Sequence, residues 1–186
     1  MPFEKETALR LLDELETRRR ELRLEEQKDY LCISICEQKL WHFREASLAF
    51  SCRVSTSRAA PSCIPGSFGT PTGLHRVAER IGDGEPCGTV FKGRLSQGFT
   101  WENSPQTVCT ENLITTRILW LDGLEVGKNR GPGCDTHSRC VYIHGTNQEV
   151  AIGRPNSHGC VLLGNADMLS LYDTVPRGSL VWISLG

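Results

Sequence analysis

The sequence predicts a mainly β fold, a sandwich or barrel-like body preceded by one amphipathic helix. Turn segments rich in Gly and Pro, such as "IGDGEPCG" and "VPRGS", recur at short intervals through most of the chain. Short apolar runs such as "LITTRILWL", "CVYIHG" and "SLVWIS" lie between them. Many short strands divided by such turns are typical of all-β bodies. The helix is predicted from a different periodicity, which is confined to the first residues.

This N-terminal helix is expected from about Glu4 to Glu26. Its apolar residues recur at spacings of three and four among charged residues, and they are Ala8, Leu11, Leu12, Leu15 and Leu22. The helix could dock on its own domain. Alternatively it could be a docking or oligomerisation element for a partner, although it contains barely two of the heptads that a coiled coil requires. We therefore divide the chain into a helical extension, residues 1–28, and a body, residues 29–186.

From Asp29 the pattern changes to a two-residue period, which predicts a half-buried strand. One predicted face carries Leu31, Ile33 and Ile35, and the other carries Cys32, Ser34 and Cys36. The polar stretch 37–39 predicts a hairpin after this strand. Further along, "NADMLSLYDTV" is the internal stretch with helical spacing.

Length and charge limit the classes of partner. A chain of 186 residues suffices for one domain of ordinary size with an appendage. It carries 21 Lys and Arg against 22 Asp and Glu, a formal net charge of -1, so its overall field does not attract nucleic acid or an anionic membrane. We expect no nucleic-acid partner. No run approaches the ~18 apolar residues of a membrane helix, and no secretory signal is visible.

Nine cysteines are a high and odd number, so internal disulfides would leave at least one thiol over. In "CDTHSRC", Cys134 and Cys140 could close a short disulfide or remain two unrelated thiols. With His137 they do not match the number or spacing of structural zinc ligands. We therefore predict no metal and no cofactor. Cys52, Cys63, Cys87 and Cys109 offer no pairing pattern.

The segment "SHGC", residues 157–160, brings together the groups that a nucleophilic cysteine requires. A free thiol is only a few per cent ionised at neutral pH, and a nearby imidazole can accept its proton. Gly159 permits a sharp turn, so that backbone amides near Cys160 can bind an oxyanion. The alternative for Cys160 is burial in the core, which is common for cysteine.

A second histidine, His144, ends the apolar run "CVYI" sixteen positions before Cys160. Two strands joined by a connection of that length could lie side by side and bring the two side chains together. His144 and Cys160 are therefore a candidate base and nucleophile.

The combination of "HGT", a Gly and a Pro, then "SHGC" with apolar residues and an Asn resembles the signature of the L,D-transpeptidase (YkuD-type) catalytic domain. The similarity extends upstream through "VSTS", "GSFGTPTGLHRVAERIGDGEPCGTVFKGR" and "ILWLDGLEVGKNRG", and downstream to "VPRGSLVWI". It covers roughly residues 29–186, all but the leading helix.

The resemblance implies a cysteine acyltransferase that acts on peptidoglycan stem peptides. Cys160 would attack the link between the third residue, a diamino acid, and the terminal D-alanine of a donor tetrapeptide. D-alanine would leave, and an acceptor amine would take the acyl group, which gives a crosslink between third-position residues. His144 would be the base, oriented by the carbonyl of Gly145. His158 and Gly159 would form the oxyanion pocket with the amide of Cys160, and Ser157 would brace the turn.

The resemblance also implies acylation by carbapenems and a location in the cell envelope or periplasm. One position departs from the family: Leu162 stands where an arginine is common, and leucine cannot hold a carboxylate. A changed substrate preference is therefore conceivable.

Two alternative functions are a hydrolase that trims stem peptides with the same nucleophile, and a non-catalytic wall-binding module.

Overall fold

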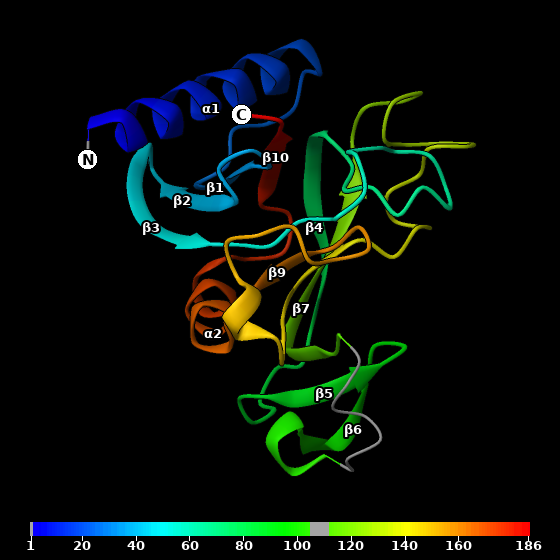
Figure 1. The fold of residues 1–186 in the computed structure, drawn as a ribbon. Helices are drawn as coiled ribbons and strands as arrows, with labels where there is room; N and C mark the ends of the chain where they lie inside the picture. The colour runs from blue at the N-terminus through cyan, green and yellow to red at the C-terminus, as the bar shows by residue number, and fades with distance from the viewer. Residues whose placement is uncertain (1, 105–111) are drawn as a thin grey trace.

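A computed structural model describes residues 2–104 and 112–186 of the protein. Its ten strands form one sheet that curls into a half-barrel, with helix α1 (Pro2–Glu21) and helix α2 (Asn165–Thr174) packed on opposite faces (Figure 1). The prediction of a mainly β body with an N-terminal helix is confirmed.

The strands are β1 (Asp29–Ser34), β2 (Lys39–Arg44), β3 (Ser47–Arg53), β4 (Gly73–Ile81), β5 (Thr89–Lys92), β6 (Leu95–Thr100), β7 (Ile114–Gly123), β8 (Tyr142–Gly145), β9 (Val161–Leu163) and β10 (Leu180–Ser184). Their order in the sheet is β3-β2-β1-β10-β4-β7-β5-β6, and β8 pairs with both β7 and β9. The pairs β1–β10 and β8–β9 are parallel, and the other pairs are antiparallel. Two short 3-10 helices are η1 (Trp101–Asn103) and η2 (Glu149–Ala151).

Helix α1 ends at Glu21, earlier than the predicted Glu26. The chain leaves the helix at Arg23, which has a left-handed φ of 54°, and the amide of Leu24 donates back to the carbonyl of Arg19 at 3.0 Å. Such a backward hydrogen bond satisfies a carbonyl at a helix end. The apolar stripe of α1 is buried against the chain's own sheet, through Ala8, Leu11 and Leu15.

Strand β1 is buried on both faces, so the prediction of a half-buried strand was wrong. Leu31 and Ile33 face the main core, whereas Tyr30 and Cys32 face α1. The two-residue period is real, but the second face is covered by a helix that the strand pattern itself does not reveal. The predicted hairpin is confirmed, because β1 pairs with β2 in antiparallel register with Ile33 opposite Leu40.

The larger core fills the concave side of the sheet beneath α2. Met168, Leu171 and Tyr172 of α2 pack there with residues of β1, β7, β8 and β9. The helix expected in "NADMLSLYDTV" is therefore present. This packing fixes the position of β8 and β9, which carry the candidate site.

All eight cysteines that the structure describes are free thiols, and Cys109 lies outside the described residues. Cys134 and Cys140 are thus two separate thiols rather than a disulfide. Within residues 2–104 and 112–186, no group of His, Cys, Asp and Glu has the arrangement of a metal site.

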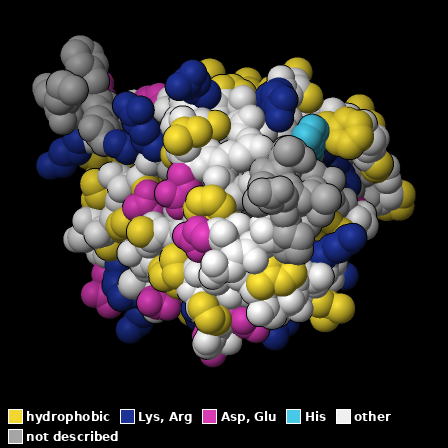
Figure 2. Space-filling view, turned by 60° about the horizontal axis from the view of Figure 1, so that its bottom comes forward, with side chains coloured by type: hydrophobic (Ala, Val, Ile, Leu, Met, Phe, Trp, Pro, Cys, Tyr) yellow, Lys and Arg dark blue, Asp and Glu magenta, His cyan; other side chains and the backbone are white. Residues whose placement is uncertain are grey.

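The surface mixes charges of both signs, and Figure 2 shows Lys and Arg side chains interspersed with Asp and Glu on the face that it presents. Among the described residues, no helix has the length and apolar character required to cross a bilayer.

Candidate active site

Cys160 and His144 are brought together by the parallel pairing of β8 and β9. The register sets Ile143 opposite Val161 and His144 opposite Leu162, so Cys160 lies level with Tyr142. Residues two apart on a strand share a face. By this register the side chain of Cys160, directly before β9, lies on the same face as that of His144 in β8.

The thiol of Cys160 is held at the edge of an apolar cluster. The amide of Tyr142 donates to the Cys160 sulfur at 3.4 Å, and the thiol faces the carbonyl oxygen of Cys140 at 3.7 Å. Burial raises the pKa of the Cys160 thiol to about 11, although the Tyr142 amide and the Arg139 cation oppose this shift. The thiol is thus protonated at pH 7, and a base is required to activate it.

His144 has the hydrogen bonding and the protonation state that such a base requires. Its Nδ1 lies 2.7 Å from the carbonyl oxygen of Gly145. Because a carbonyl oxygen only accepts hydrogen bonds, Nδ1 carries the proton and Nε2 is left as the basic nitrogen. Burial lowers the pKa of His144 to about 4, so the imidazole is neutral at pH 7.

A buried polar network packs directly against Gly145. The side-chain oxygen of Asn165 accepts from Thr115 at 2.6 Å and from Thr116, and the Asn165 amide donates to the Thr146 carbonyl at 2.9 Å. A Cβ added at Gly145 would lie 2.6 Å from that Asn165 oxygen. The site therefore requires glycine at this position. Thr115 and Thr116, two polar residues inside an apolar run, were the sequence signal for this network, and the sequence alone predicted no role for them.

Ser157 braces the turn that carries the thiol. Its hydroxyl donates to the Cys160 carbonyl at 2.6 Å and accepts from the Gly159 amide at 3.1 Å. Gly159 has a φ of 127°, which side-chain-bearing residues rarely adopt. The turn conformation therefore depends on both residues.

We expect Ser157→Ala to destabilise the protein by about 1–3 kcal/mol, because the buried Gly159 amide loses its acceptor. The turn should also loosen, so that thiol alkylation of Cys160 becomes faster. Urea unfolding and alkylation rates would measure the two effects. Ser157→Thr keeps the hydroxyl and is the matched comparison. Wild-type stability in the alanine variant would contradict the bracing role.

His158 and Leu162 differ in their exposure to solvent. The His158 side chain is exposed and approaches Phe68 edge-on, with ring centroids 6.0 Å apart. Leu162 is only 1% exposed, level with His144 and bonded through its backbone to Ser55. Residue 162 is thus sealed inside the protein, and its side chain does not reach the solvent side of the site.

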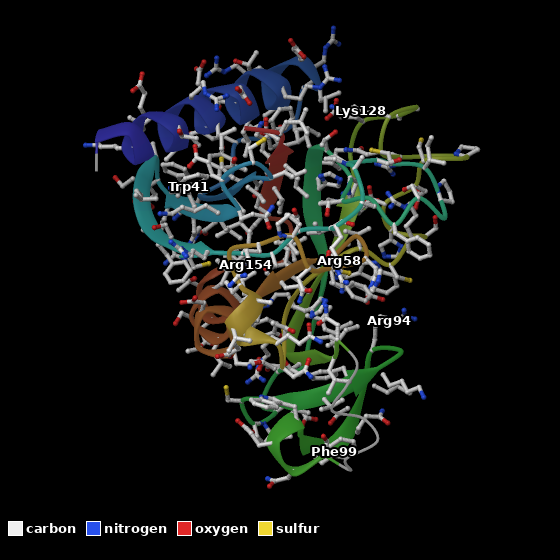
Figure 3. All side chains as sticks on the ribbon, in the orientation of Figure 1. Trp41, Arg58, Arg94, Phe99, Lys128 and Arg154 are labelled. Carbon is white, nitrogen blue, oxygen red and sulfur yellow. The ribbon has the colours of Figure 1, made fainter. Side chains whose placement is uncertain are left out.

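Aromatic residues next to the thiol were not predicted as part of the site. Trp120 and Tyr142 belong to the cluster on which Cys160 packs. The guanidinium of Arg94, from the β5–β6 turn, lies 4.4 Å from the Trp120 ring centre and donates to the Tyr142 hydroxyl at 3.0 Å. Figure 3 labels Arg94 above the β5–β6 hairpin, on the side toward the loops. The hairpin is thereby anchored beside Cys160.

Two buried neutral histidines should make the protein sensitive to acid. Burial lowers the pKa of His75, like that of His144, to about 4. Between pH 6.5 and 4 the unfolded chain binds protons on these rings that the folded protein does not. The free energy of unfolding should therefore fall as pH decreases through this range, by on the order of 3 kcal/mol per histidine.

Urea titrations at several pH values between 7 and 4.5 would measure this slope. His75→Gln removes one of the two groups and should flatten the slope, whatever its effect on stability at pH 7. An identical slope in the variant would contradict the assignment of neutral buried His75.

Comparison with known proteins identifies the family of the chain. The family model of the YkuD L,D-transpeptidase catalytic domain matches residues 28–183. YqjB of Bacillus subtilis, assigned by name to the L,D-transpeptidases, is 39% identical over 49 residues, which are 26% of this chain and 28% of YqjB. This chain therefore matches well under half of that relative.

Solved structures share the fold. The L,D-transpeptidase from Xylanimonas cellulosilytica superposes with a TM-score of 0.54 at 18% identity, covering 86% of this chain and 62% of that one. L,D-transpeptidase 3 from Mycobacterium tuberculosis, in complex with a faropenem-derived adduct, gives 0.53 at 15% identity, covering 84% and 60%. The family match spans most of the chain and includes every predicted site residue. The protein belongs to the L,D-transpeptidase (YkuD) catalytic domain family.

Proposed function

We propose that the protein is a peptidoglycan L,D-transpeptidase with Cys160 as the nucleophile. The sulfur attacks the carbonyl carbon between the third residue and the terminal D-alanine of a donor tetrapeptide. The C–N bond breaks, D-alanine leaves, and a thioester remains. An acceptor amine on a second stem then attacks the thioester, which forms a new amide and returns the thiol. The proposal rests on the adjacency of Cys160 and His144 on parallel strands.

Proton transfer runs through Nε2 of His144. Both groups are neutral at pH 7, because burial raises the pKa of the thiol and lowers that of the imidazole. The thiol therefore gives its proton to Nε2 as the sulfur attacks, and Nε2 gives it to the leaving nitrogen. In the second half, Nε2 takes the proton from the acceptor amine. The Gly145 carbonyl stabilises the transient imidazolium through Nδ1.

The oxyanion is bound at the "SHGC" turn. The Gly159 amide already donates to Ser157, so Gly159 contributes the turn conformation rather than a free donor. The Cys160 amide is the donor that this turn presents to the substrate, and His158 lies at its exposed rim.

Incubation with a donor tetrapeptide tests the proposal. We expect release of D-alanine and a mass increase on Cys160 equal to the donor minus D-alanine. Addition of an acceptor amine should convert the adduct to a crosslinked product. A hydrolase would give the trimmed tripeptide with and without the amine. A folded protein that forms no adduct would contradict both activities.

The same thiol should be acylated by carbapenems, as the L,D-transpeptidase LdtMt1 has been solved in complex with imipenem. Because the substrate is cell-wall peptidoglycan, we place the site of action in the cell envelope.

A further inference from the structure

Arg139 is a partly buried cation near the thiol. Among the described residues it forms no ion pair, whereas Arg18 is paired with Glu125 and Arg76 with Asp122. Its Nη1 donates to the Ser62 carbonyl at 2.8 Å. Its Nη2 donates to the Gly69 carbonyl at 2.7 Å. These acceptors, and the Ser67 hydroxyl oxygen 3.5 Å from Nη2, fix the guanidinium. All three are neutral, so no residue within 2–104 and 112–186 compensates its charge.

The guanidinium lies beside the reactive turn. Arg139 directly precedes Cys140, whose carbonyl oxygen lies 3.7 Å from the Cys160 sulfur. The Gly69 oxygen that accepts from Arg139 would lie 3.5 Å from a Cβ built on Gly159. Arg139 therefore holds the loop of residues 62–69, which packs against the turn that presents the thiol.

A carboxylate would relieve the unfavourable environment of this cation. Arg139 is partly buried, and this desolvation lowers its pKa, while the sulfurs of Cys63 and Cys160 oppose the shift. A guanidinium has five N–H donors, and the two carbonyls use only some of them. A partly desolvated arginine with donors to spare is suited to hold a carboxylate through charge-assisted hydrogen bonds.

The proposed donor supplies such a carboxylate. The leaving D-alanine carries it on the carbon bonded to the nitrogen that is expelled, so it lies close to the attacked carbonyl. Leu162, level with His144, cannot bind it, because this side chain is uncharged and buried. A cation from another segment is therefore required if the carboxylate is to be recognised.

We propose that Arg139 binds the terminal carboxylate of the donor peptide and thereby selects stems that end in a free D-amino acid. This inference rests on the proposed function for the identity of the peptide. It assigns specificity to a segment outside both the "HGT" and "SHGC" motifs. Removal of the guanidinium should weaken binding of a carboxylate donor selectively. A purely structural role in holding the loop would affect all donors equally.

The test compares a tetrapeptide acid with the same peptide bearing a C-terminal carboxamide. Binding is measured by calorimetry on the Cys160→Ala protein, in which no acyl transfer occurs. We expect the acid to bind about tenfold more tightly, as one good charge-assisted contact allows. Arg139→Gln should lower acid affinity to that of the amide and leave amide affinity unchanged. Arg154→Gln removes an exposed arginine preceding the same turn and should change neither (Figure 3).

Several results would overturn the inference. The first is equal affinity for the acid and the amide in the Cys160→Ala protein. This measurement keeps Arg139 intact, so it does not depend on the folding of an Arg139 variant. Equal weakening of both peptides by Arg139→Gln would reduce Arg139 to a support for the loop.

Failure of the proposed function gives a different pattern. If Arg139-dependent preference for the acid is present but the wild type forms no adduct, the transpeptidase proposal fails and the carboxylate site stands. If acid and amide donors acylate Cys160 equally well, the enzyme activity stands and the inference about Arg139 fails.

Discussion

Cys160→Ala is expected to abolish adduct formation and to lower the rate of D-alanine release by at least about 10³–10⁴-fold, the usual loss when a nucleophile is removed. The remaining groups of the site can bind a donor but cannot form the thioester. The substitution removes one sulfur atom at a partly exposed position, so the fold should be retained. Intact-mass measurement after incubation with a donor or a carbapenem gives a direct readout.

Cys87 provides the matched control. Its thiol is exposed and belongs to the β4–β5 connection rather than to the turn that carries Cys160. Cys87→Ala should form the same adduct at the wild-type rate. An adduct that persists in Cys160→Ala, or one that disappears in Cys87→Ala, would show that acylation occurs elsewhere.

His144→Gln is expected to reduce acylation of Cys160 by about 10²–10⁴-fold at pH 7, the range for loss of a general base. With the pKa of the thiol at about 11, only on the order of 10⁻⁴ of it is ionised at neutral pH. The variant must use this small fraction. Its rate should therefore rise about tenfold per pH unit between pH 7 and 10, because each unit increases the thiolate fraction tenfold.

The wild type should follow a different pH profile. His144, with its pKa lowered to about 4, is an unprotonated base throughout the neutral range. The wild-type rate should be nearly constant above about pH 5 and should fall below pH 4, when the imidazole is protonated. Carbapenem acylation rates between pH 4 and 10 would measure both profiles. A wild-type midpoint near 6.5, or parallel profiles in the two proteins, would contradict the mechanism.

The site was more predictable from the sequence than its electrostatics. The interval between His144 and Cys160 predicted neighbouring strands, because a loop of that length joins two adjacent strands readily. The direction of both pKa shifts was not predictable, since burial of the thiol and the imidazole depends on how the surrounding sheet closes. The hydrogen-bond network around Gly145 was also not predicted from the sequence. It depends on Asn165 and Thr115, which meet only when α2 packs on β7 and β8.

The same limit applies to the fold. Turn residues and short apolar runs indicated a mainly β body, because these signals are local. The burial of β1 on two sides was missed, since the second cover is a helix from another part of the chain. Arg139 likewise gave no signal in the sequence, because its proposed role depends on the lack of an acidic partner among the residues that the structure describes.

Helix α1 hides the convex side of the sheet, and this has a practical consequence for protein production. Beneath it lie Tyr30, Cys32, Trp41, Phe43 and Leu74, all nearly inaccessible to solvent. A shortened chain that starts at residue 29 would keep every motif of the family but present these side chains to water. Large exposed apolar patches promote self-association. We therefore expect such a fragment to precipitate on expression, and crystallographic or biochemical work should retain the first 28 residues.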